Sequence, residues 1–395
     1  MSKNENKSKF NKVIITGGAS VFNRNNYLAE KVRDIIDLNN SLKNGKVTLE
    51  EAKRSCKDRQ FPVDERYSKR ISAEFSVINA LKKAGHLSEQ FDVTILHTDT
   101  KDGCFAAEIN KKIIEQQFNT NVKLVEVENL DVSNSRKLRE NLGDFMEKLS
   151  RELVQSYKEY TFFAPVGGYK LMTYLGYVVG SFYGYETGYL YEENQVLIKI
   201  PPMPLKIDID WILKKRDLLT KLLKDEIVYY SDLAEEDKIF INENSFFFEK
   251  VSDENDQLVS LNAYGKFILK DYLLTRKLVS KHLIHMFDNA KYRNHIQSNL
   301  LNLISKVKSF YRDGNKGKNI IGEIMHNKEW GFDKPYLYKG DSNGELIFRC
   351  LWDYDFSNDV IKIFEIWTNH GDYERECKAI ANKGYNNPEE MIEIG

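Results

Sequence analysis

The chain has 395 residues, of which 42% are hydrophobic and 30% charged, as in an ordinary soluble protein with room for two or three domains. Lys and Arg number 58 against 59 Asp and Glu, so a nucleic-acid surface has to be local rather than global. The four cysteines form no Cys-x-x-Cys pair, which predicts neither a disulfide framework nor a metal site and suits a reducing cytoplasm. No signal core and no long apolar run is found, so neither secretion nor a membrane is expected.

The first half of the chain, from residue 11 to about 206, alternates short apolar strands with helices. Strands are expected at 13–15, 93–96, 122–127 and 161–164, and helices at 68–83, from 106 onward and at 136–157. This alternation is typical of an α/β domain with a doubly wound, parallel sheet. A hairpin at 189–191 and 196–200, turned at 192–194, and prolines at 201, 202 and 204 are expected to close the domain.

A polar loop containing glycine follows three of these strands: residues 16–20, 97–103 and 165–170. Loops after parallel strands meet at the carboxyl edge of the sheet, where ligands bind. Gly167 and Gly168 expose backbone amides, the next helix begins there, and Lys170 adds a cation. The pattern predicts a phosphate-bearing, nucleotide-like ligand. A Gly-Gly turn that serves only to pack the helix closely on the sheet is the alternative.

The middle segment, residues 207–275, is predicted to form a helix, a short helix, a hairpin and a helix, an order similar to a winged helix. It carries 15 acidic against 9 basic residues, which is a poor match to the phosphates of duplex DNA. Residues 207–280 are therefore interpreted as a winged-helix-like linker or dimerisation domain.

The last part of the chain, residues 281–395, is predicted to form an α+β domain, with helices first and then a small antiparallel sheet. Residues 281–339 hold 11 Lys or Arg against 5 Asp or Glu, interleaved with aromatic side chains. This mixture suits single-stranded RNA, whose phosphates need cations and whose bases stack on rings. Strands are expected at 346–352 and 360–368, with a solvated basic helix as the alternative to an RNA surface.

The first two hundred residues resemble the CARF domain, the Rossmann-like sensor of CRISPR-associated proteins that binds cyclic oligoadenylates. The likeness rests on Ile14-Ile-Thr-Gly-Gly-Ala-Ser20, Ser72-Ala-Glu74, Leu96-His-Thr-Asp-Thr-Lys-Asp-Gly103, Gly167-Gly-Tyr-Lys170 and Ile200-Pro-Pro-Met-Pro204. The resemblance implies a homodimer with the ligand ring across its two-fold axis, and a two-fold sensor suits cyclic tetra-adenylate. The implied ligand-binding residues are Thr16, Gly17, Gly18, Ser20, Asp99, Thr100, Gly167, Gly168, Tyr169 and Lys170.

Val166 stands directly before the glycine pair, where members of this family that cleave their ligand often have Ser or Thr. Without that hydroxyl, slow or no cleavage of the bound ring is expected.

The last hundred residues resemble RelE-type toxins, small ribosome-dependent mRNA endonucleases. The residues that carry this likeness are Lys334-Pro-Tyr-Leu-Tyr-Lys339, Phe348-Arg349 and Asn369-His-Gly-Asp-Tyr373. The sequence departs from the family in having His370 where an arginine is usual. Acidic residues also crowd the tail at Asp372, Glu374 and Glu376.

RNA cleavage of this kind uses the RNA's own 2′-hydroxyl, so it needs a base, an acid and cations on the phosphate, with no metal cofactor. Arg349 is the candidate for holding the phosphate through its bidentate fork. His370 is the candidate acid or base, and Tyr373 is expected to stack on a base or donate a proton. Lys334 and Lys339 are expected to hold the RNA backbone. A core role for Tyr373 and a loop role for His370 remain open.

Two other functions are compatible with parts of the sequence. Arg276-Lys-Leu-Val-Ser-Lys-His282 matches the Arg-x5-His motif of HEPN ribonucleases, although the strand-like run at 346–368 has no place in an all-helical HEPN domain. A non-enzymatic CARF winged-helix regulator of DNA is the second alternative, and the acidic middle segment counts against it.

The favoured hypothesis is a cytoplasmic, homodimeric type III CRISPR accessory effector with three domains: 1–206, 207–280 and 281–395. Cyclic oligoadenylate acts as its allosteric activator, and mRNA on the ribosome is the expected partner and substrate.

Overall fold

The protein, described by a computed structural model, separates into two compact units, Met1–Leu205 and Lys206–Gly395. The structure describes residues 9–23, 31–64, 66, 71–128, 130, 135–191, 196–203, 215–224, 228–252, 256–312, 321–342, 344, 346–388 and 390–394. The expected boundary at residue 206, the turn at 192–194 and Pro204 lie outside these residues. Among the described helices, none is both long enough and apolar enough to span a bilayer.

Unit 1 contains a six-stranded sheet with the order β3-β2-β1-β4-β5-β6. Its strands are β1 (Phe10–Thr16), β2 (Leu87–Thr98), β3 (Asn121–Val127), β4 (Thr161–Ala164), β5 (Thr187–Tyr191) and β6 (Val196–Ile200). Strands β1 to β5 pair in parallel, and β6 runs antiparallel to β5. The α/β class and the 196–200 hairpin arm are therefore confirmed. The chain winds from β1 outward through β2 to β3 and then crosses to β4 on the other side of β1, which places the switch point between β1 and β4.

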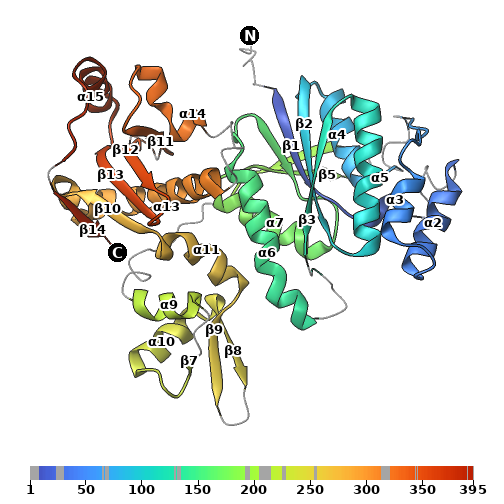
Figure 1. Ribbon diagram of the computed structural model, residues 1–395, viewed down its shortest axis with the longest axis horizontal. Helices are drawn as coiled ribbons and strands as arrows, with labels where there is room; N and C mark the ends of the chain where they lie inside the picture. Colours follow the sequence, from blue (N-terminus) through green and yellow to red (C-terminus); the bar gives the residue numbers. More distant parts are fainter. Residues whose placement is uncertain are drawn as a thin grey trace. The chain divides into compact units, whose positions relative to one another are not determined.

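Helices cover both faces of this sheet, with α2, α3 and α5 on one side and α6 and α7 on the other (Figure 1). Their bounds are α2 (Arg33–Lys43), α3 (Leu49–Ser55), α4 (Ala73–Lys83), α5 (Lys101–Phe118), α6 (Ser135–Val154) and α7 (Lys170–Phe182). Helix α5 begins five residues before the expected position because the Thr100 hydroxyl accepts a hydrogen bond from Gly103 N and caps it. Ser72 caps α4 in the same way.

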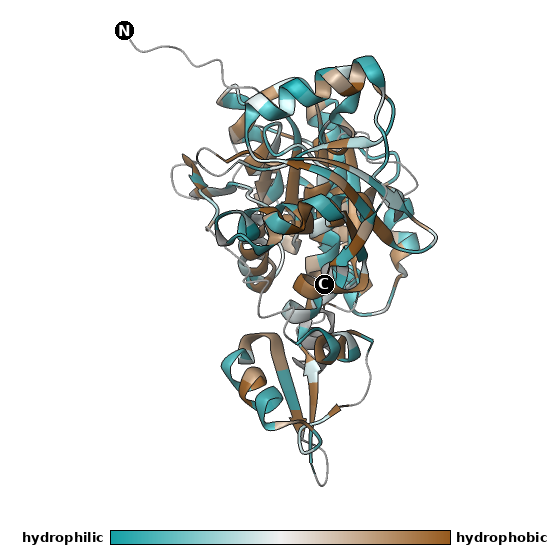
Figure 2. Cartoon of the chain, turned by 90° about the vertical axis from the view of Figure 1, so that its left-hand side faces the viewer, coloured by the Kyte–Doolittle hydropathy of each residue, from teal (hydrophilic) through white to brown (hydrophobic). Residues whose placement is uncertain are grey.

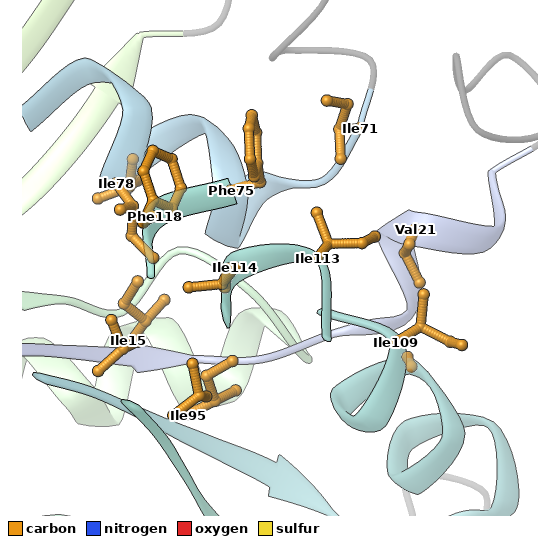
Figure 3. Close-up of a cluster of buried hydrophobic side chains, with 14 of the residues drawn as sticks. Ile15, Val21, Ile71, Phe75, Ile78, Ile95, Ile109, Ile113, Ile114 and Phe118 are labelled. Atoms are coloured by element: carbon orange, nitrogen blue, oxygen red, sulfur yellow. The ribbon is translucent and has the colours of Figure 1, made fainter. Parts of the chain in front are cut away.

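The core of unit 1 lies between β1, β2 and the helices α4 and α5. Ile15 and Ile95 from the strands meet Ile109 and Ile113 from α5, all at most 1% exposed (Figure 3). The ring of Phe75 on α4 stacks on Phe118 at 5.3 Å between centroids. This packing holds the start of α5 beside the ends of the strands, which is where the loops begin.

The first part of unit 2 follows the expected order of helix, short helix, hairpin and helix. Its elements are α9 (Arg216–Leu223), β7 (Val228–Tyr229), α10 (Glu235–Glu243), β8 (Phe248–Ser252), β9 (Gln257–Leu261) and α11 (Ala263–Leu274). The three strands form a separate sheet with the order β7-β9-β8.

The second part of unit 2 is built on a five-stranded sheet with the order β11-β12-β13-β10-β14. The strands are β10 (Arg276–Ser280), β11 (Tyr336–Lys339), β12 (Arg349–Asp355), β13 (Val360–Trp367) and β14 (Met391–Ile394), with helices α12 (Ile284–Asp288), α13 (Ala290–Arg312), α14 (Ile321–Ile324) and α15 (His370–Lys383). In Figure 2, hydrophobic (brown) and hydrophilic (teal) positions both occur along the strands.

The hairpin of β12 and β13 was predicted correctly, and within residues 281–395 helices do precede antiparallel strands, but the sheet has a further strand that was not predicted. β10 precedes the helices and pairs in parallel with β13, and β14 adds to its other edge. β10 also falls inside the segment 207–280 that was assigned to the linker. The strand was missed because it begins with two charged residues, Arg276 and Lys277, and therefore shows no apolar run.

Candidate ligand-binding and catalytic sites

The first and third loops of unit 1 interlock at the switch point between β1 and β4. The hydroxyl of Thr16, at the end of β1, donates to the carbonyl oxygen of Gly167 at 2.7 Å. In return, the Gly167 amide donates to the carbonyl oxygen of Thr16 at 3.0 Å. Both residues are buried. These reciprocal bonds fix the two loops as one rigid edge.

The glycines of these loops are required by their close approach. A Cβ on Gly18 would lie 2.3 Å from the Gly168 nitrogen, and one on Gly167 would lie 2.4 Å from the Thr16 carbonyl oxygen. Gly168 has a φ of +83°, which side chains rarely adopt. The packing alternative therefore explains Gly167. Its amide was expected to be free for a ligand, but it donates to Thr16 O instead. Gly168 is exposed, and its amide has no partner among the described residues.

Glu74 on α4 holds the first loop from behind and was not among the predicted site residues. Its carboxylate accepts a hydrogen bond from the Gly18 amide at 2.6 Å and lies 3.5 Å from the Ser20 hydroxyl. The side chain is completely buried, and this burial raises the pKa of the Glu74 carboxyl, against the opposing effect of the Gly18 N–H. The signal available in the sequence was a single acidic residue in the otherwise uncharged run from Ala73 to Leu81.

The second loop contributes mainly structural hydroxyl groups. Thr98 and Thr100 share a hydrogen bond of 2.9 Å between their side-chain oxygens, and Thr100 caps α5. The Thr100 hydroxyl is therefore engaged in capping α5, a structural role that the sequence reasoning did not assign to it. The backbone of Asp99 is fixed by a bond of 3.2 Å from its amide to Val127 O, and its side chain is half-buried at the edge.

The third loop places its polar groups at the first turn of α7. Tyr169 occupies the N-cap position without a side-chain cap, and Lys170 is the first helical residue and is exposed. The amides of a first helical turn lack partners within the helix and carry the positive end of its dipole. Val166, one residue before the glycine pair, packs against the hydrophobic core of unit 1. Exposed donors and a cation therefore sit on a rigid, buried base.

This edge lies at the carboxyl ends of parallel strands, the position where α/β domains of this class commonly bind their ligands. Residues 69–203, about one third of the chain, match a family model described as CRISPR-associated protein (Cas_APE2256). The match supports a CRISPR-associated protein, and it spans Glu74, the second loop and the Gly167–Lys170 turn. No curated protein matches the chain.

In unit 2, Arg349 lies inside the protein rather than on its surface. Only 5% of it is exposed, and its Nη1 donates to the carbonyl oxygens of Phe348 at 2.8 Å and Gly340 at 3.1 Å. Its guanidinium carbon lies 5.6 Å from the ring centre of Tyr373, and its Nε has no partner among the described residues. Burial lowers the pKa of Arg349, although the nearby Tyr373 opposes this effect.

Tyr373 and His370 lie one turn apart on α15, but in different surroundings. Tyr373 is buried, and its hydroxyl accepts a hydrogen bond of 2.7 Å from Trp330 Nε1. The core role left open for Tyr373 is therefore correct for its ring. His370 is the first residue of α15 and is exposed, so its placement in a loop after a strand was wrong. The helix begins there because the Asn369 side chain accepts from Asp372 N.

His326 was missed by the sequence reasoning and lies closer to the predicted cations than its position suggests. Its ring is paired with Glu329 at 3.2 Å, and its side chain is 11% exposed. Burial lowers the pKa of His326, Glu329 raises it, and the charges of Lys339 and Arg349 lower it further. No sequence motif marks this residue, because it precedes β11 by ten positions and meets these cations only through folding.

The two predicted lysines do not act at one place. Lys339 is exposed at one end of β11 and is paired in register with Arg349. Lys334 precedes the other end of this strand and pairs with Asp353 at 3.6 Å. The two lysines therefore lie at opposite ends of β11. Lys334 therefore does not join the cluster of His326, Lys339, Arg349 and Tyr373.

The HEPN motif does not lie on a helix. Arg276 is in strand β10 and pairs with Glu393 at 2.9 Å, while His282 on a 3-10 turn pairs with Glu365 at 2.9 Å. Both residues belong to the five-stranded sheet region, and each is already bound to a carboxylate. The HEPN alternative is therefore disfavoured.

Proposed function

We propose that this chain is a type III CRISPR accessory effector in which cyclic oligoadenylate binds unit 1 and activates a ribonuclease in unit 2. The observation that carries the proposal is the exposed Gly168–Lys170 turn on an interlocked, buried base, inside the segment that matches the CRISPR-associated family. In this proposal unit 1 is a Rossmann-like CARF domain, and unit 2 combines a winged-helix-like segment with a RelE-like domain.

The ligand is held by groups that remain accessible at the edge. The Gly168 amide, the first turn of α7 and Lys170 bind its phosphates, and Ser20 and Asp99 face its ribose or base edges. Two copies of the edge in a homodimer give a site with two-fold symmetry, which a cyclic tetra-adenylate shares. Because Val166 offers no hydroxyl and packs into the core, unit 1 binds the ring without cleaving it.

The ribonuclease centre is the cluster of His326, Lys339, Arg349 and Tyr373. A base removes the proton of the RNA 2′-hydroxyl, the 2′-oxygen attacks the adjacent phosphorus, and the 5′-oxygen leaves with a proton from an acid. Lys339 and Arg349 hold the phosphate. His326 is favoured over His370 as the acid or base because it lies within the electrostatic reach of both cations.

An RNA cleavage assay on the full chain tests the proposal. Cyclic tri-, tetra- and hexa-adenylate are added separately, with and without translating ribosomes, and binding is measured in parallel. We expect the four-membered ring to bind and to switch on cleavage. Lys170→Ala is expected to lose binding, whereas His326→Ala is expected to bind normally and lose cleavage. Binding without any RNA cleavage contradicts the ribonuclease, and no binding of any ring contradicts the sensor.

The acid-base assignment has its own control. His370→Ala, on the exposed first residue of α15, is expected to retain cleavage if His326 carries the proton transfer. Full activity of His326→Ala together with loss in His370→Ala would return the role to His370. A gel shift on duplex DNA in the presence of the ring distinguishes the remaining alternative, a winged-helix regulator.

A further inference from the structure

Three side chains capable of binding a metal ion converge beside the second loop of unit 1. His97 lies near the end of β2, Glu126 is its register partner on the neighbouring strand β3, and Cys104 lies in the first turn of α5. The Sγ atom of Cys104 lies 3.3 Å from Glu126 Oε2. One ligand atom from each residue lies within 4.8 Å of the other two. Strand pairing and helix capping, rather than a local motif, bring them together.

His97 is buried and its ring is oriented by the backbone. The residue is only 5% exposed. Its Nδ1 lies 3.0 Å from the carbonyl oxygen of Thr98, which makes Nδ1 the hydrogen-bond donor and leaves the lone pair on Nε2. A backbone carbonyl that orients a histidine in this way is a common outer partner of metal ligands.

Cys104 and Glu126 supply the charge that a divalent cation would balance. The Cys104 thiol donates to Glu126 and, at 3.5 Å, also lies near the carbonyl oxygen of Thr98. A metal ion at this position would displace the proton that the thiol donates to Glu126. A thiolate and a carboxylate together carry two negative charges, which match one dication with a neutral imidazole.

This set of ligands selects the type of metal. Thiolate with imidazole and carboxylate suits zinc, whereas magnesium and calcium prefer oxygen ligands alone. Ligand atoms about 2.0–2.3 Å from a tetrahedral zinc ion are about 3.5 Å from one another. The observed spacing therefore needs side-chain shifts of about 1 Å. A water molecule can complete the shell.

We propose that His97, Cys104 and Glu126 bind one zinc ion that joins β2, β3 and the start of α5 next to the 98–103 loop. The site is independent of the proposed ligand and ribonuclease, because it needs only these three side chains. No metal site was predicted from the sequence because it contains no Cys-x-x-Cys pair. That motif marks only ligands close together along the chain, and here parallel strands bring distant ligands together. A closed hydrogen-bonded cluster without metal is the alternative that the test has to exclude.

The test measures metal directly on the full, tag-free chain. The protein is stripped with a chelator and titrated with cobalt, a zinc substitute whose bond to a thiolate gives a charge-transfer absorption in the near ultraviolet. We expect one cobalt ion per chain, displaced by an equal amount of zinc. Cys104→Ser is expected to lose the absorption band and to weaken binding at least tenfold. Cys56→Ser, which changes another buried cysteine of unit 1, is the matched control and is expected to keep both.

A second variant protects the test against misfolding. Glu126 is exposed, so Glu126→Gln is expected to fold normally, to keep the thiolate band and to weaken cobalt binding about tenfold. Zinc is expected to raise the melting temperature of the wild type and of Cys56→Ser, but not of Cys104→Ser. A wild-type chain that binds no cobalt, or a Cys104→Ser variant that binds it with the same band, overturns the proposal.

Discussion

The two candidate sites differ in how far their charged and polar groups can be reached from solvent. In unit 1, Gly168 and Lys170 are exposed on a base that is fixed by buried hydrogen bonds. In unit 2, Arg349 and Tyr373 are each only 5% exposed. Of the predicted residues in this cluster, Lys339 is the one that is exposed. Under the proposed function, the first site takes up an anion directly, whereas the second has to open before RNA reaches Arg349. Such a difference is the one expected between a sensor and an enzyme held inactive.

Arg349→Ala is expected to have the largest effect. It removes the hydrogen bonds to the carbonyls of Phe348 and Gly340 and leaves a cavity, which together cost about 3 kcal/mol of stability. Cleavage is expected to fall more than 100-fold. All four tryptophans, at 211, 330, 352 and 367, lie in unit 2, so their fluorescence during urea unfolding reports this unit. Arg375→Ala, on an exposed side chain, is the control.

Arg349→Lys separates catalysis from packing at this position. Lysine keeps the charge but cannot reproduce the planar fork, so partial recovery of stability without recovery of cleavage is expected. Recovery of both would reduce Arg349 to a buried structural cation, and the comparison between the two sites would lose its catalytic half.

Gly18→Ala is expected to have the next largest effect, now in unit 1. Its Cβ would lie 2.3 Å from the nitrogen and 2.9 Å from the Cα of Gly168, so the interlocked loops must separate. Overpacking of this kind costs about 1–3 kcal/mol, and we expect binding of the ring to weaken at least 100-fold. Isothermal titration calorimetry measures the binding. Gly371→Ala, where the nearest atom is 3.7 Å from the new Cβ, is expected to bind normally.

Lys170→Ala is expected to have a smaller and purely local effect. The side chain is exposed, so stability changes by less than about 0.5 kcal/mol, while loss of one cation weakens ring binding about 10-fold to 100-fold. The loss should shrink as salt is raised, because ions screen exposed charges. Lys46→Ala, exposed in the same unit, is the control. Equal binding by both variants would show that backbone amides alone hold the ligand.

The sequence predicted the parallel sheet, its three loops and the β12–β13 hairpin because each depends on local patterns of apolar residues and glycines. It did not predict which amides remain open, because the bond from Gly167 to Thr16 joins residues 151 positions apart. His326 and the metal-binding cluster were missed for the same reason. Their partners come from separate strands and helices, and no spacing along the chain records that they meet.

The smallest expected effect concerns the buried carboxylate behind the first loop. Burial raises the pKa of Glu74 above its ordinary value of 4.5, so the folded state holds this proton more tightly than the unfolded state. The stabilisation from the protonated form is complete below about pH 4.5 and is lost as the pH rises through the folded pKa. A tenfold difference in proton affinity between the two states corresponds to about 1.4 kcal/mol. Glu74→Gln removes this titration, so its stability should not fall with the wild type's over that range.

Hydrogen exchange of peptides from β1 measures this difference in unit 1, which has no tryptophan, after correction for the intrinsic exchange rates. We expect the wild type to lose protection relative to Glu74→Gln as the pH rises. Glu50→Gln, on a side chain that is 76% exposed, should run parallel to the wild type. If Glu74→Gln also runs parallel to the wild type, then the hydrogen bond from Gly18 offsets the effect of burial on the Glu74 pKa. Glu74 would then bind its proton equally well in the folded and the unfolded state.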